Sequence, residues 1–64
     1  MPQAETNQAK ILKRLLADGF EFQRHGADHD LYRHPETKVV ISLPRHRTVS
    51  PGVARQIAKA AGWI

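Results

Sequence analysis

Apolar residues recur at helical spacing in the first third of the chain. Four of them form one stripe, namely Ile11, Leu12, Leu15 and Leu16. The Thr6 hydroxyl can cap the start of this helix, and Asp18-Gly19 can end it because glycine tolerates a left-handed conformation. We therefore predict a helix over residues 6–18.

A second amphipathic segment lies near the C-terminal end. Ser50-Pro51 is typical of a helix start, with a capping hydroxyl followed by a proline at the first helical position. The apolar stripe consists of Val53, Ile57, Ala60 and Ala61. Gly62 can end the helix, so we predict that it covers residues 51–61.

Between the helices, apolar and polar residues alternate with the period of two that is typical of strands. Two turn sequences, Gly26-Ala27-Asp28 and Pro35-Glu36-Thr37, separate three such runs. In the second run, residues 29–34, Leu31 and Tyr32 point to opposite sides. Pro44 ends the third run because proline cannot donate to a strand ladder.

The order of elements predicts an α+β fold with two layers, α-β-β-β-α. Only one face of each strand is apolar, so both helices should cover the same face of a three-stranded antiparallel sheet. This is the architecture of double-stranded-RNA-binding domains, although a fold does not fix a function. The residues expected to be mostly buried are Leu12, Leu15, Phe20, Phe22, Ile41, Val53 and Ile57.

Length and charge narrow the possible functions. The chain has 64 residues, enough for one domain over residues 1–64 and too few for a deep substrate cavity. Ten basic residues against six acidic ones give a net charge of +4, and such a positive field attracts polyanions. With no cysteine, no signal sequence and no apolar run of about 20 residues, we expect a soluble, cytoplasmic protein.

The candidate chemistry lies in four histidines that occur among arginines. His29 stands where a glycine turn meets a strand, so a rigid frame can hold its side chain at the surface. Histidine exchanges protons near neutral pH, and RNA carries its own nucleophile, the 2′-hydroxyl. One histidine and a few arginines can therefore make a modest ribonuclease. The alternative is a surface histidine without a role.

Other kinds of site find less support in the sequence. His25 is interpreted as an exposed strand residue and His34 as part of a turn. Acidic residues and histidines cluster at residues 25–30, but they lack the spacing of known zinc sites, so we expect neither a metal nor a cofactor. The predicted RNA-binding residues are Arg24, Gly26, Arg33, Arg45, His46 and Arg47.

Several segments, in their order and spacing, resemble the HicA toxins. They are Gly19-Phe20, Arg24-His25-Gly26-Ala27-Asp28-His29-Asp30-Leu31-Tyr32, Leu43-Pro44-Arg45-His46, Ile57 and Ala60-Ala61-Gly62-Trp63. The resemblance runs from about Lys10 to Trp63. It implies a double-stranded-RNA-binding-like fold and an mRNA-cleaving ribonuclease with His29 as catalytic residue. It also implies a HicB antitoxin that covers the active site, and we expect that partner to contact His29 and at least one of Arg45 and Arg47.

The turn departs from the family pattern, because many relatives carry Gly-Ser-His where this chain has a longer turn with Asp28 before the histidine. A carboxylate beside a histidine favours its protonated, acidic form, so the role of His29 as acid or base stays open. If Leu31 faces the helices, alternation directs His29 to the same side, and His29 must then lie at the rim of the sheet. The sequence also leaves two other functions open, a non-catalytic RNA- or DNA-binding module and a protein-interaction domain.

Overall fold

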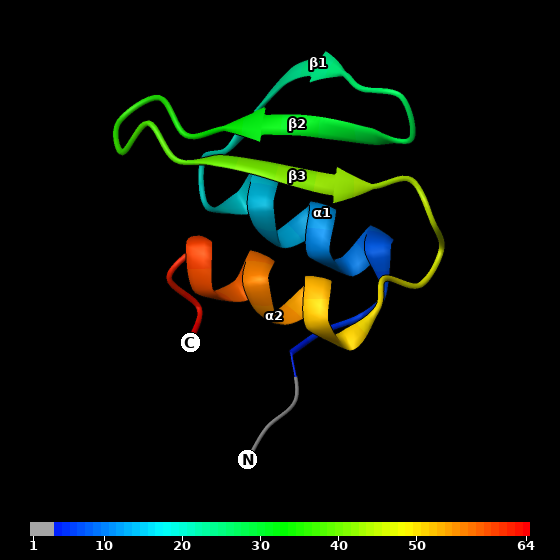
Figure 1. The fold of residues 1–64 in the computed structure, drawn as a ribbon. Helices are drawn as coiled ribbons and strands as arrows, with labels where there is room; N and C mark the ends of the chain where they lie inside the picture. The colour runs from blue at the N-terminus through cyan, green and yellow to red at the C-terminus, as the bar shows by residue number, and fades with distance from the viewer. Residues whose placement is uncertain (1–3) are drawn as a thin grey trace.

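A computed structural model describes residues 4–64 and confirms the predicted order of elements. They are α1 (Gln8–Ala17), β1 (Glu21–His25), β2 (His29–Arg33), β3 (Val40–Pro44) and α2 (Pro51–Ala60). The strands form one antiparallel sheet in the order β1-β2-β3. Figure 1 shows both helices on the same side of this sheet, and within residues 4–64 no further helix or strand covers its other face. This is the two-layer α+β fold that the alternation of strands and helices predicts.

The two helices begin at polar caps, one of which differs from the prediction. Asn7 caps α1, since its side-chain oxygen accepts from the N–H of Lys10 at 3.0 Å. The expectation that Thr6 is the cap is wrong, because the helix begins at Gln8 and Asn7 directly precedes it. Thr6 lies one residue earlier, where its carbonyl accepts from the N–H of Val49 at 2.8 Å. The cap of α2 is the predicted Ser50, followed by proline at the first helical position. The predicted helix bounds were too long by one or two residues at three of the four ends.

Both helices end in the same glycine-dependent turn. Gly19 and Gly62 adopt φ angles of 100° and 80°, in the left-handed region that glycine enters without steric cost. The N–H of Phe20 then reaches back to the Leu15 carbonyl at 3.0 Å, and that of Trp63 makes the equivalent bond at 2.8 Å. These bonds satisfy carbonyls that a helix end otherwise leaves unpaired.

The register of β2 against β3 determines which side chains enter the core. Tyr32 lies opposite Ile41, and both are buried. Leu31 therefore points to the opposite, open face of the sheet, as alternation requires. The buried core residues that form one cluster are Ile11, Leu15, Phe20, Tyr32, Ile41, Leu43, Val49 and Ile57.

Most of the predicted core is confirmed, with one clear error. Four of the seven expected residues are buried, and Leu12 and Val53 are partly buried against the cluster. Phe22 is 49% exposed. It lies in β1, at the edge of the sheet remote from the helices, where its ring contacts that of Tyr32 with centroids 5.8 Å apart (Figure 1). The prediction failed because the two helices pack against β3 and leave this edge uncovered.

A β-bulge in β1 changes the direction of one basic side chain. Phe22 pairs with Tyr32 and Arg24 pairs with Leu31, so Gln23 is an extra residue between the two pairs. Strict alternation would place Arg24 on the same face as Phe22. The bulge turns Arg24 to the open face instead.

No helix within residues 4–64 combines the length and apolar character needed to cross a bilayer.

Replacing Gly19 by alanine should destabilise the fold more than replacing Gly62. Both substitutions place a side chain at positive φ, which costs about 1–2 kcal/mol. At Gly19 the new Cβ would also lie 3.1 Å from Nε2 of His34, whereas nothing lies within 4 Å at Gly62. Urea unfolding followed by circular dichroism measures both losses. Equal losses would show that the contact with His34 adds nothing.

Candidate active site at the turn between β1 and β2

His29 lies on the open face of the sheet. It is the first residue of β2 and pairs with Pro44 of β3, two positions from Leu31 and on the same side. His29 and Leu31 share one side, as alternation predicts, but that side is the open face because Tyr32, and not Leu31, faces the helices. The side chain of His29 is 36% exposed, so a ligand lying on the open face can reach it.

Asp28 holds one nitrogen of the His29 ring. Its Oδ1 lies 3.0 Å from Nδ1 of His29. The hydrogen bond from His29 is the main reason that the pKa of the Asp28 carboxyl lies below its ordinary value of 3.8; the charges of His29 and His46 lower it further. Asp28 is thus an acceptor, Nδ1 of His29 is its donor, and Nε2 remains for another partner.

Gly26 provides the space in which the ring of His29 lies. A Cβ on this glycine would be 2.7 Å from Nε2 and 2.9 Å from Cε1 of His29, closer than such atoms come in proteins. The N–H of Gly26 also donates to the His29 carbonyl at 2.6 Å. The missing side chain therefore allows His29 to lie over the turn with Nε2 next to the backbone.

Arg45 binds the same turn from the end of β3. Its Nη2 donates to the carbonyls of Gly26 and Ala27 at 2.9 and 2.8 Å, and its own N–H donates to the Asp28 carbonyl at 3.0 Å. Its Nε is 3.8 Å from a carboxylate oxygen of Asp30. The sequence indicated Arg45 as an RNA contact and missed this positioning role, which only the pairing of residue 45 with residue 28 could have suggested.

The other predicted RNA-binding residues form two groups, one on the same face as His29 and one at the same end of the sheet. Arg24 and Arg33 pair with Leu31 and Val40, which places both arginines on the open face with His29. His46 and Arg47 are exposed in the loop that follows β3. His29 pairs with the last residue of β3, so this loop begins at the same end of the sheet.

The remaining two histidines have other surroundings. His25 is exposed and pairs with Asp30, whose Oδ1 lies 2.8 Å from its Nδ1, on the helix-facing side. His34 donates from Nε2 to the Asp18 carbonyl at 3.0 Å and accepts at Nδ1 from the N–H groups of residues 36 and 37. His34 therefore belongs to the turn, as predicted. Of the two strand histidines, His29 alone lies on the open face.

The family of the chain follows from a comparison with family models. The model that describes the HicA toxin of bacterial toxin–antitoxin systems matches residues 9–63. The chain belongs to the HicA toxin family. Among curated proteins, a sequence search finds no match.

Membership in the HicA family establishes a toxin role and, because these toxins act in toxin–antitoxin pairs, an antitoxin partner. It confirms the resemblance carried by the glycine turn, by the sequence after β3 and by the C-terminal helix. The match over residues 9–63 includes all three of these segments.

Replacing Gly26 by alanine should displace the His29 ring without unfolding the protein. The ring is the free end of a side chain and can move away from the new Cβ. It would then lose its bond to Asp28, and the pKa of that carboxyl should rise towards 3.8. Carbon-13 NMR titration of the Asp28 carboxyl measures this.

Gly52→Ala is the matched control for this experiment, since a Cβ at Gly52 has nothing within 4 Å. It should leave the pKa of Asp28 unchanged. A pKa that stays low in Gly26→Ala would contradict the proposed contact between ring and turn.

Proposed function

We propose that this HicA-family toxin is a metal-independent endoribonuclease that cleaves mRNA with His29. Cleavage would inhibit translation in the cytoplasm until a HicB-type antitoxin binds. One observation carries the proposal: His29 lies on an open, arginine-bearing face with Nδ1 bound to Asp28 and Nε2 free over Gly26.

The chemistry requires only groups that this face offers. In RNA cleavage the 2′-oxygen attacks the neighbouring phosphorus, the bond to the 5′-oxygen breaks, and a proton moves from the first oxygen to the second. A histidine near neutral pH can take or give that proton. Asp28 fixes the ring through Nδ1, which leaves Nε2 to take the proton from the attacking oxygen or to give one to the leaving oxygen.

The arginines on this face and at this end of the sheet can bind the phosphate backbone of RNA. Arg24 and Arg33 share the open face with His29, while His46 and Arg47 are exposed at the end of the sheet where His29 lies. Contacts from such residues position a nucleic acid. Gly26 adds no side chain beside Nε2, so a phosphate could approach the ring closely.

An antitoxin that silences this site must cover His29. We expect it to contact His29 together with Arg47 or Arg45, through an acidic patch that complements the basic surface.

A non-catalytic RNA- or DNA-binding module is the second candidate. The placement of two arginines on the uncovered sheet face supports it, since that face would bind a polyanion without any chemistry.

Replacing His29 by alanine should abolish RNA cleavage and growth inhibition. Positioned proton transfer contributes typically about 10²–10⁴-fold in rate, while the loss of a half-exposed ring should hardly change folding. The assay is gel analysis of an mRNA incubated with each variant, with circular dichroism as the folding check. Cleavage by the unmutated protein should survive EDTA, because the proposed mechanism uses a histidine for proton transfer and arginines for the phosphate charge.

His25→Ala is the matched control, because His25 is exposed and lies on the other side of the sheet. This variant should cleave RNA normally. Undiminished cleavage by His29→Ala would refute the catalytic role of His29. RNA binding without any cleavage by the unmutated protein would favour the non-catalytic module.

Arg45 and Arg47 should respond differently to replacement by glutamine. Arg45→Gln removes the bonds to the turn carbonyls, so kcat on an RNA oligonucleotide should fall while the salt dependence of binding changes little. Arg47→Gln should weaken binding and reduce the salt slope by about one, as expected for one lost phosphate contact, with kcat retained. A loss of salt dependence in both variants would show that Arg45 also contacts phosphate.

A further inference from the structure

β3 is an edge strand with unpaired backbone groups. The ladder bonds that flank it involve odd-numbered residues: Val39 accepts from the N–H of His34 at 2.9 Å, and Arg45 donates to Asp28 at 3.0 Å. Antiparallel bonds alternate along a strand. Val40 and Ser42 therefore direct their N–H and C=O groups away from β2, towards the edge.

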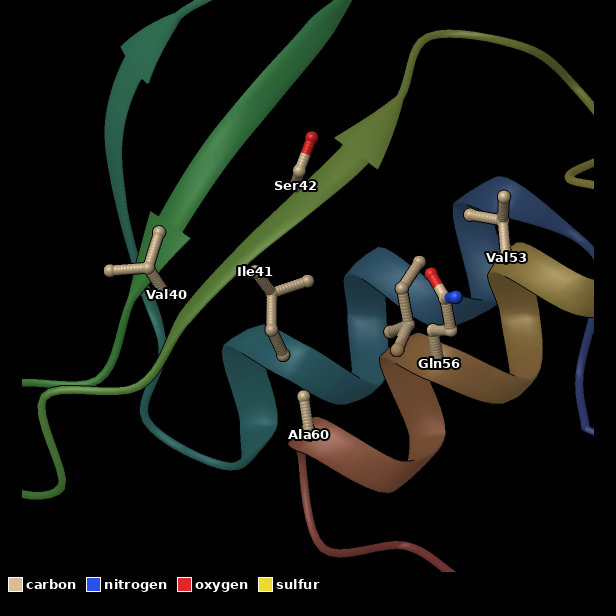
Figure 2. A pocket seen from close by; sticks show the side chains of 7 residues that line it. Val40, Ile41, Ser42, Val53, Gln56 and Ala60 are labelled. Carbon is tan, nitrogen blue, oxygen red and sulfur yellow. The ribbon is translucent and has the colours of Figure 1, made fainter.

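An apolar groove runs beside this edge, between β3 and α2 (Figure 2). In Figure 2, Val53, Gln56 and Ala60 of α2 lie across the groove from Val40 and Ile41 of β3. Ile41 and Ile57 are buried in it, whereas Val40 is 51% exposed. A strand added to β3 would place every second side chain over this groove.

The part of the chain that forms the groove carries basic and no acidic side chains. All six acidic residues of the chain lie between residues 5 and 36. The part that follows, residues 37–64, contains five basic residues and no acidic one. The groove is lined entirely by residues of this basic part, so its electrostatic complement is an acidic partner.

We propose that the β3 edge binds an extended, acidic and apolar segment of the antitoxin as a fourth strand of the sheet. Its backbone pairs with Val40 and Ser42, its apolar side chains lie over the α2 groove, and its acidic side chains face the surrounding basic residues. A second copy of this chain would bring the same basic half against itself. The inference goes beyond the proposed RNA cleavage, because it requires nothing of His29.

The length of the edge limits the strength of this contact. β3 covers only Val40–Pro44, and Pro44, at the next outward position, offers no N–H. A free peptide should therefore bind weakly. As part of a larger antitoxin that also covers the open face, the same segment would bind at a high effective concentration.

A capped heptapeptide, acetyl-Glu-Val-Glu-Val-Glu-Val-Glu-amide, is the probe for this edge. Added to the ¹⁵N-labelled protein at millimolar concentration, it should shift the amide resonances of β3 and α2 and slow hydrogen exchange at Val40 and Ser42. The same peptide with lysine in place of glutamate should bind at least tenfold more weakly. Sedimentation of the protein alone should show a monomer.

Two variants test the pairing and the groove separately. Ser42→Pro removes an outward N–H but no ladder bond to β2, and prolines are tolerated at such edge positions. Ala60→Gln extends the groove wall without altering the strand, and Ala9→Gln on the exposed side of α1 is its matched control. Peptide affinity should fall at least tenfold in the first two variants and stay unchanged in the third.

Several results would overturn the proposal. They are the absence of binding by the acidic peptide, equal binding of the lysine peptide, unchanged peptide affinity in both Ser42→Pro and Ala60→Gln, and resonance shifts confined to the open face around His29. A concentration-dependent dimer that Ser42→Pro disrupts would assign the edge to a second copy of this chain. None of these readouts depends on RNA cleavage, so a failure here is distinct from a failure of the proposed activity.

Discussion

The antiparallel register of β2 against β3 is the constraint on which the rest of the structure depends. It pairs Tyr32 with Ile41 in the core and His29 with Pro44 on the open face. A slip of one residue would exchange the two faces, burying His29 and exposing Tyr32. The same register lets Arg45 reach Asp28 and turns the backbone of Val40 outward. Core, candidate site and free edge are therefore consequences of one pairing.

The helices and strands could be predicted from the sequence because their signals are local. A capping serine before a proline, and a glycine after an apolar stripe, each act through bonds that span only a few residues. The choice between Thr6 and Asn7 as cap of α1 is different, since both side chains can accept the bond. In the structure Thr6 lies before the cap, and its carbonyl pairs with the N–H of Val49, 43 residues further along the chain. A local sequence pattern does not reveal such a distant contact.

The candidate site was predictable in its members but not in its arrangement. Residue type and a glycine turn indicate His29, and the same turn brings Asp28 next to it. The face on which His29 lies depends on which neighbour fills the core, and alternation alone does not decide between Leu31 and Tyr32. The bulge that turns Arg24 to the open face could not be predicted either. The alternation of residue types through this strand continues without a break, so the sequence does not mark the extra residue.

Arg45 shows that a basic side chain predicted to contact RNA can also be bound within the protein. Its guanidinium donates to two carbonyls of the turn that carries His29, so its charge is used within the protein. In the proposed function, phosphate would then be bound mainly by the arginines of the open face and by the loop after β3. The two proposed interactions are centred on different surfaces of this small domain. RNA would lie on the open face, while the antitoxin strand would pair at the β3 edge. An antitoxin fixed to that edge could cover His29 with the rest of its structure and need not compete with RNA for every contact.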